Sequence, residues 1–397
     1  MTTTQNKAHV QPPKRRLSWN DPSVRAIVYQ ALALSVVGLA VWFLVSNTLT
    51  NLAARNIATG FAFLNREAGF AIGESLIAYS PADTYGRAIW VGIFNTLRVA
   101  VLGLVLATVL GTIIGIARMS KNFLINKVAS VYVEVMRNIP LLLQLFFWYA
   151  IITESTPGPR NALNPISGVF ISNRGLMIPG LEGASLDWIL GAIGLAIVAS
   201  IVLANWAGKH HAKTGHMFPL GRCILGLFIV LPVIGWLVSG ASLTLDMPEL
   251  RGFNFSGGVT MSPEFTALLT GLVIYTSAFV AEVVRSGVQS VGTGQWEAAG
   301  SLGLRSRMVL RLVVLPQALR VIIPPMTSQY LNLTKNSSLA IAVGYPDLRA
   351  TLGGTTLNQT GREMESMIVM MGIYLAISLI ISGIMNIYNS RVKLKER

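Results

Sequence analysis

Long apolar stretches alternate with shorter polar ones along most of the 397-residue chain. Eight of these stretches are long enough to be membrane-crossing helices, because about 20 residues of α-helix cross the roughly 30 Å hydrocarbon core of a bilayer. The expected spans are Ala26–Ser46, Ile89–Ala117, Val128–Ile152, Trp188–Ala207, Cys223–Val238, Phe265–Val284, Leu319–Val343 and Met367–Ile387. The pattern therefore predicts an all-α integral membrane protein with about eight transmembrane helices.

Two of the expected spans contain residues that interrupt the apolar pattern. The third holds Glu134 and Arg137, and the part after Arg137 alone would be too short to cross, so we expect the charged turn to lie at the end of the span. The seventh holds Pro324 and Pro325, followed by several polar residues. That pattern is typical of a broken helix that exposes backbone and polar groups to a water-filled cavity.

Composition supports a membrane protein and limits its chemistry. Charged residues make up 12% of the chain, against about 25% in an ordinary soluble domain. The single cysteine, Cys223, allows no internal disulfide, and the four histidines lie in polar or basic stretches without a carboxylate or cysteine at ligand spacing. We therefore expect no metal site and no cofactor. The P-loop and the common hydrolase and dinucleotide motifs are missing, so the chain is not expected to be an enzyme or to carry its own ATPase site.

The charged residues are distributed unevenly between the loops. With the N-terminus inside the cell, the cytoplasmic segments hold twenty of the 31 Lys and Arg residues but only three of the 17 Asp and Glu residues. Short cytoplasmic loops of membrane proteins are enriched in Lys and Arg. The pattern predicts a multi-pass protein of the lipid bilayer with both termini cytoplasmic. This topology accounts for the net charge of +14, so no nucleic-acid partner is expected.

The loop after the sixth span contains a short helical pattern outside the apolar segments. Gln295–Leu302 is composed of good helix formers, with Thr293 as a candidate N-cap and Gly303 as a stop signal. The predicted helix is too small to bury itself, and small residues on its face suit the groove of a partner protein. The alternative is a helix at the membrane surface that only connects two spans.

Seven residues of this loop and the segment after it have the spacing of a known motif. Glu297-Ala298-Ala299, three residues, Gly303, nine residues, Val313, one residue and Leu315-Pro316 match the EAA loop of bacterial ABC importer permeases, with valine in place of the usual isoleucine. The segments 137–147, 282–287, 316–325 and 331–339 resemble the polar amino acid permeases of the histidine and glutamine type. The resemblance covers spans two, three, six, seven and eight, and the enlarged layout is similar to the general L-amino-acid permease branch.

The resemblance implies a subunit of a binding-protein-dependent importer that moves L-amino acids, with broad specificity, across the bacterial inner membrane. Its partners would be a cytoplasmic ATP-binding subunit, a second related permease subunit and a periplasmic amino-acid-binding protein. The EAA helix would sit in a cleft of the ATPase. Glu297 would then pair with a basic group there, Ala298 and Ala299 would allow close approach, and Gly303 would permit the sharp turn.

The resemblance also implies a division of the chain into a five-helix core with additions. The inserted pair of spans contains almost no polar residue and is expected to be scaffold rather than pathway. The expected segments are a cytoplasmic N-terminal segment (1–25), an extra span with a periplasmic loop (26–87), the first part of the permease core (88–152), periplasmic loops with an inserted two-span hairpin (153–264), the second part of the core with the EAA loop (265–390) and a cytoplasmic tail (391–397).

Polar residues inside the spans are candidates for the substrate path, because such residues are costly in a membrane. The candidates are Glu282, Gln329, Asn332, Asn336 and Ser337. Alternatives remain open: Lys335–Ser338 would lie at the outer headgroup level, and Glu282 would form a local ion pair with Arg285.

Two other charged groups have simpler interpretations. Glu134 has the same three-residue spacing to Arg137 and is expected to pair with it locally. Arg98, three residues after Asn95 at the outer end of the second span, is expected to extend to the membrane surface.

Two other function classes compete with an ABC permease. A secondary transporter would use an ion gradient, with Glu282 as a proton site, but the chain shows no paired repeat and the EAA spacing would have no role. A membrane subunit that transports nothing would not need the polar, proline-containing seventh span. Both are weaker interpretations than a permease driven by partners.

The charge distribution makes the topology testable with cysteine labelling. In a background without Cys223, a cysteine at Lys213 should be protected from an impermeant thiol reagent in intact cells, because its loop is positively charged. A cysteine within Asn161–Ser172 should be labelled. Labelling of position 213 from outside would contradict the eight-span topology and make the inserted hairpin re-entrant.

Overall fold

The computed structural model of the chain describes residues 22–54, 60–182, 185–214, 218–240 and 244–392. Most of the expected cytoplasmic segment 1–25 and of the tail 391–397 lies outside these residues. The helices are α1 (Pro22–Ala54), α2 (Tyr85–Ala117), α3 (Phe123–Asn138), α4 (Leu141–Ala150), α5 (Ser185–Thr214), α6 (Leu220–Ser239), α7 (Pro263–Gln289), α8 (Thr293–Ser301), α9 (Ser306–Val309), α10 (Leu315–Asn336), α11 (Leu357–Thr360) and α12 (Glu363–Val392).

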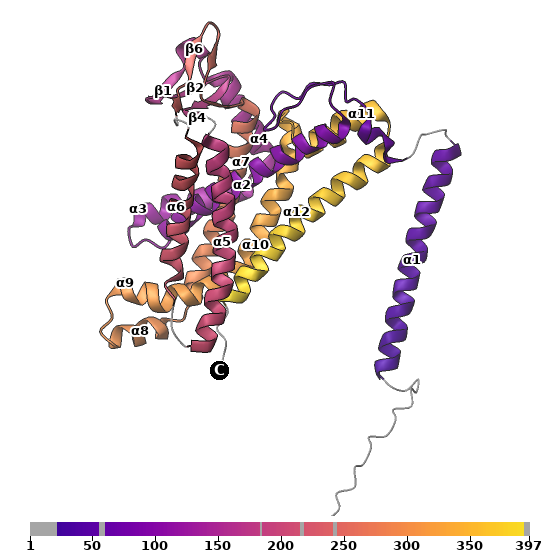
Figure 1. Cartoon of the computed structure of the whole chain (residues 1–397). Helices are drawn as coiled ribbons and strands as arrows, with labels where there is room; N and C mark the ends of the chain where they lie inside the picture. Colours follow the sequence, from indigo (N-terminus) through magenta and orange to yellow (C-terminus); the bar gives the residue numbers. More distant parts are fainter. Residues whose placement is uncertain (1–21, 55–59, 183–184, 215–217, 241–243, 393–397) are drawn as a thin grey trace, which may run out of the picture.

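Seven helices in the described residues are long and apolar enough to cross a membrane, and the count is eight if the bent pair α3–α4 forms one span. The prediction of a mainly helical membrane protein with about eight spans is therefore confirmed. Figure 1 shows α8 and α9 at one end of the bundle and the short strands at the other. We call these the α8 end and the strand end.

The expected third span is broken in its middle. α3 and α4 meet at an angle of 104° around Ile139 and Pro140. Pro140 has no N–H, and the residue before a proline avoids helical backbone angles. The buried Gln144 side chain donates hydrogen bonds to the carbonyl oxygens of Met136 (2.9 Å) and Ile139 (3.0 Å). The charged turn therefore lies at the end of α3, ahead of the break.

The expected break of the seventh span at its two prolines is wrong. α10 continues through Pro324 and Pro325, and the helix first changes at Ser337, where a 3₁₀ segment (Ser337–Val343) begins. Both prolines are exposed. They remove two consecutive backbone donors, and helices in membrane proteins tolerate such a loss where neighbouring groups compensate. The 3₁₀ segment ends at Gly344, which has a φ of 81°.

The core is centred on the contact between α2 and α7. A Cβ at Gly111 would lie 2.7 Å from the carbonyl oxygen of Ser277, and one at Gly115 would lie 2.8 Å from that of Ala281. Only glycine permits backbones this close. Next to this contact, α4, α7 and the 3₁₀ segment share a cluster of buried apolar side chains that includes Leu145, Phe265, Leu268, Leu272 and Tyr345.

The segment 153–264 contains strands that the sequence analysis did not predict. They are β1 (Leu163–Ile166), β2 (Val169–Ser172), β3 (Gly175–Ile178), β4 (Gly180–Glu182), β5 (Thr244–Asp246), β6 (Glu249–Arg251), β7 (Asn254–Ser256) and β8 (Val259–Met261). β1, β2, β3 and β8 form one antiparallel sheet, in which Leu176 pairs with Met261. β4 pairs with β5, so strands before α5 and after α6 join at the strand end. The hairpin α5–α6 therefore extends from a small β structure.

Candidate functional site

The segment with EAA spacing forms an exposed helix at the α8 end. α8 begins at Thr293 and is capped by Gly292, so Thr293 is the first helical residue and not the N-cap. Gly303 has a φ of 75°, and its N–H donates to the Gly300 carbonyl oxygen at 2.9 Å. The predicted helix and its glycine stop are thus present, and the chain turns sharply after Gly303.

Of the three motif residues in α8, one faces the protein and two face outward. Ala299 is buried in a cluster with Val291, Val309 and Val314. Glu297 and Ala298 are exposed, and Leu302 is 79% exposed. The expectation that Ala299 faces a partner is therefore wrong, because its methyl group packs within its own chain. The outward surface consists of Trp296, Glu297, Ala298, Leu302 and Gly303.

The remaining motif residues, Val313, Leu315 and Pro316, lie within the next candidate span, Ser306–Val343. Leu315 and Pro316 are the first two residues of α10, and both are exposed. A π-helical segment (Leu310–Val314) precedes Leu315 without a break, and the Leu315 N–H donates to the Leu310 carbonyl oxygen. One residue after Pro316, the Gln317 side-chain amide donates to Gln295 of α8 at 3.2 Å. This side-chain hydrogen bond links α8 to the beginning of α10.

Glu282 lies among three arginines rather than beside Arg285 alone. Its carboxylate accepts from the Arg118 guanidinium, and it lies 3.5 Å from a nitrogen of Arg137 and 3.8 Å from one of Arg285. Arg118 follows α2, Arg137 lies at the end of α3, and Glu282 belongs to α7. One carboxylate thus joins three helices.

Two interpretations of charged residues need correction. Arg137 pairs with Glu282, and no ion pair with Glu134 occurs among the described residues. Arg98 does not extend to the surface. Its guanidinium pairs with Glu74 of the loop before α2 and lies 4.1 Å from the centre of the Phe265 ring. Its side chain is 13% exposed. Neither partner was predictable, because each lies far away in the sequence.

The candidate path residues of α10 fall into two groups. Asn332 is exposed and Gln329 and Asn336 are half-buried, and the three lie on one side of the helix. Ser337 is buried, and its hydroxyl donates to the Thr334 carbonyl oxygen at 2.7 Å. Ser337 therefore supports the helix end and does not present its hydroxyl to solvent.

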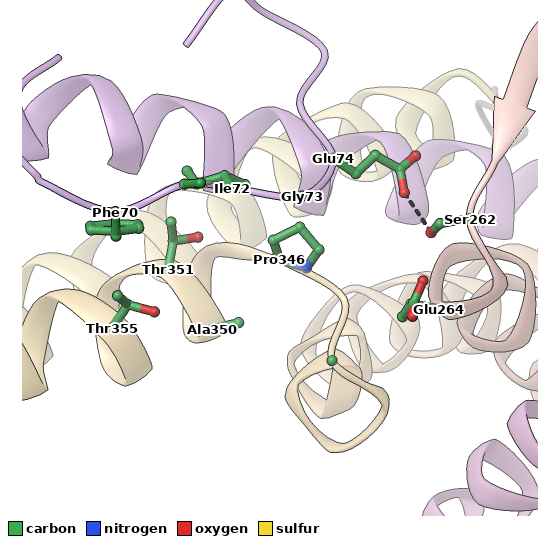
Figure 2. A pocket seen from close by; sticks show the side chains of 12 residues that line it. Phe70, Ile72, Gly73, Glu74, Ser262, Glu264, Pro346, Ala350, Thr351 and Thr355 are labelled. Atoms are coloured by element: carbon green, nitrogen blue, oxygen red, sulfur yellow. Dashed lines mark hydrogen bonds between the residues drawn. The ribbon is translucent and has the colours of Figure 1, made fainter. Parts of the chain in front are cut away.

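A cavity of about 380 Å³ opens at the strand end (Figure 2). Its walls come from the loop before α2, the start of α7 and the segment after the 3₁₀ turn. The Ser262 hydroxyl donates to Glu74 at 2.6 Å, and Glu264 lies at its edge. The lining residues are Phe70, Ala71, Ile72, Gly73, Glu74, Ser262, Glu264, Gly344, Pro346, Ala350, Thr351 and Thr355. No pattern in the sequence predicts this site, because nothing local marks the loop containing Glu74 as part of the core.

Behind this cavity, Asp347 is fully buried and well bonded. Its carboxylate accepts from the Ala350 N–H at 2.8 Å and from the Tyr374 hydroxyl at 3.1 Å. The neighbouring Leu348 N–H donates to Thr96 of α2 at 3.0 Å. Burial raises the pKa of Asp347 to about 7, and hydrogen bonds from the backbone and Tyr374, together with the charge of Arg349, oppose part of that rise. Asp347 therefore links the cavity wall to α2 and α12.

Comparison with known proteins shows the family. A family model described as "binding-protein-dependent transport system inner membrane component" matches residues 218–394. The chain is 50% identical to the putative amino-acid ABC transporter permease protein YhdX of Escherichia coli (strain K12), over 97% of this chain and 98% of the relative. It is 48% identical to the general L-amino acid transport system permease protein AapQ of Rhizobium johnstonii, over 96% of each chain.

Two more distant matches have amino-acid transport in their names. The glutamate/glutamine/aspartate/asparagine transport system permease protein BztB of Rhodobacter capsulatus is 44% identical over 97% of this chain and 99% of its own. A solved structure described as an amino acid ABC transporter with histidines is 22% identical, with a TM-score of 0.46 over 77% of this chain and 95% of that one.

The three permease relatives assign a class and then a family. The chain is a permease protein of a transport system. Within this class it belongs to the amino-acid ABC transporter permeases. The resemblance noted in the sequence is confirmed. The relatives are multi-pass permease subunits of transport systems and not enzymes in themselves.

The buried Asp347 predicts a pH dependence of stability. The folded protein holds the proton up to a pH of about 7, whereas the unfolded chain releases it near 3.8. The cost of ionising a buried carboxyl therefore grows as the pH rises through this window. Between about pH 5 and about pH 8, the thermal unfolding midpoint of the wild type should fall relative to that of Asp347→Asn.

A control separates this effect from other titrations. Asp83→Asn, in an exposed turn at the strand end, should keep the wild-type trend. An identical pH trend for Asp347→Asn and the wild type would show that Asp347 does not titrate in this window.

Proposed function

We propose that the chain is the permease subunit of an importer that moves L-amino acids, with broad specificity, across the bacterial inner membrane. The observation that carries this proposal is the identity of about half of all residues, over nearly the whole length, with amino-acid ABC permeases. The exposed α8 with EAA spacing adds the means of coupling to ATP hydrolysis. The name of one relative, a general L-amino acid transport system permease protein, supports the broad substrate class.

The energy source would be a separate cytoplasmic ATP-binding subunit. Trp296, Glu297, Ala298 and Leu302 form an exposed surface that projects from the bundle, and a short helix of this kind fits a groove on a partner. Glu297 would pair with a basic group of that partner. Gly303 would let the chain turn back toward α10 without a side chain between the two proteins.

Two further partners complete the proposal. A periplasmic amino-acid-binding protein would deliver substrate at the strand end, where the acid-lined cavity opens. A second, related permease subunit would cover the polar side of α10 that carries Gln329, Asn332 and Asn336, so that the path lies between two chains. With both termini in the cytoplasm, the α8 end is the cytoplasmic end.

The coupling role is tested by placing a charge at the turn after α8. Gly303→Asp should leave the protein in the membrane but abolish ATP-driven uptake, because a charged side chain would occupy a turn held at a φ of 75° against the partner. Uptake into vesicles containing the whole transporter is the measurement.

The chain offers a matched control for this variant. Gly361 also has a positive φ, 64°, and a Cβ added there would have no atom within 4 Å. It follows α11, at the end of the bundle away from α8 (Figure 1). Gly361→Asp should therefore carry the same backbone strain and charge but retain uptake. Equal uptake by Gly303→Asp and the wild type would remove Gly303 from the ATPase contact.

The path is tested by removing one amide from the polar side of α10. Asn332→Leu should lower maximal uptake at saturating binding protein by roughly ten- to a hundredfold, the equivalent of one hydrogen bond to a charged ligand. Asn51→Leu makes the same change at an exposed position of α1 and should have little effect. Unchanged uptake by Asn332→Leu would place this side of α10 outside the path.

A further inference from the structure

Four charged side chains form a cluster at the α8 end, with more positive than negative charge. They are Glu282, Arg118, Arg137 and Arg285, and we call them the arginine cluster. Three guanidinium groups surround one carboxylate, so the cluster carries a net charge of +2. No other acidic group makes an ion pair with these arginines in the described part of the chain.

The guanidinium groups of the arginine cluster have spare hydrogen-bond donors. A guanidinium carries five N–H donors, and charge-assisted bonds to carboxylates have N–O distances of about 2.7–2.9 Å. Arg137 and Arg285 lie at 3.5 and 3.8 Å from Glu282, too far for strong hydrogen bonds. Arg118 is 8% exposed, and its Nε is buried without a hydrogen-bond partner in the described structure.

Exposure shows where another group has access to these donors. The side chain of Arg118 is 7% exposed and forms the base of the cluster. Those of Arg137 and Arg285 are 41% and 35% exposed, and that of Glu282 is 34% exposed. The open side of the cluster is therefore lined by the two arginines that Glu282 satisfies least.

We propose that the arginine cluster is a binding site for an oxyanion, a carboxylate or a phosphate. Planar, five-donor guanidinium groups match the oxygen geometry of both ligands. Glu282 keeps the three arginines together by pairing with each of them, and the ligand occupies the open side between Arg137 and Arg285. An oxyanion there neutralises charge that a partly buried position otherwise leaves unpaired.

Two sources supply this chemistry. One is the phosphate of an anionic lipid in the leaflet at the α8 end, and the other is the α-carboxylate of an amino acid on its way through the permease. The second source rests on the proposed function, whereas the first does not. Direct binding measurements on the purified transporter separate the two, independently of uptake.

The experiment changes the charge of the cluster in both directions. Arg137→Gln removes one positive charge from the open side and should weaken oxyanion binding about tenfold or more. Glu282→Gln removes the competing negative charge but keeps an amide oxygen that can accept from Arg118, so the arginines stay together and binding should strengthen. Opposite effects are the signature of a binding site, because damage to the fold would weaken binding in both variants. Arg222→Gln, an exposed arginine of α6, is the control and should leave binding unchanged.

Two probes identify the source. Vesicles of phosphatidylethanolamine with phosphatidylglycerol report the lipid arm, and native mass spectrometry counts the phosphatidylglycerol retained by the whole transporter. Radiolabelled L-amino acids bound to the transporter in lipid-free maltoside detergent report the substrate arm. If Arg137→Gln retains less phosphatidylglycerol than the wild type and Glu282→Gln retains more, the site binds lipid phosphate. If the amounts of bound L-amino acid change in these two directions, the site binds substrate carboxylate. If neither probe responds to Arg137→Gln and Glu282→Gln, the proposal is wrong.

Discussion

In the hydrocarbon interior of a membrane, water does not bond to a free backbone N–H or C=O, so each must find a partner within the protein. This constraint explains where the helices of this chain bend. The break at Pro140 frees the carbonyl oxygens of Met136 and Ile139, and the Gln144 amide donates to both. At the end of α10, the hydroxyl groups of Thr334 and Ser337 bond to backbone carbonyls one turn earlier. A change of direction occurs where a polar side chain replaces the lost bonds.

The same reasoning applies to charges, whose cost in a membrane is larger. Arg98 would be unfavourable on α2 alone, but Glu74 reaches it from the preceding loop and the Phe265 ring covers its other side. At the α8 end, Glu282 of α7 pairs with three arginines. One follows the end of α2, one lies at the end of α3 and one is on α7 itself. Both arrangements join elements that are distant in the sequence, so charge pairing fixes the relative positions of α2, α3 and α7.

Local patterns in the sequence predicted the structural features that depend on neighbouring residues alone. Apolar runs gave the spans, and the Gly303 stop gave the end of α8, because both reflect the backbone and its immediate surroundings. The strands were missed, since β1–β2 is a hairpin with the short turn Ser167-Gly168, and three- and four-residue strands carry little periodicity. The sequence did not predict the burial of Asp347 or the ion-pair partners of Arg98 and Arg137, which are Glu74 and Glu282. Tertiary packing determines all three. The inward position of Ala299 also depends on packing, which the motif spacing does not encode.

Packing also determines which other helices would move if α8 were displaced. Ala299 of α8 shares one buried cluster with Val280 and Val284 of α7, and with Ala318 and Ile322 of α10. The Ile322 side chain approaches Gly287 so closely that a Cβ at Gly287 would lie 2.2 Å from it. Close-packed interiors transmit strain, because no free volume absorbs it. Glu282 lies on the same stretch of α7 and holds Arg118 and Arg137. A force on α8 therefore acts on α7 and α10 together, and through one carboxylate it reaches the ends of α2 and α3.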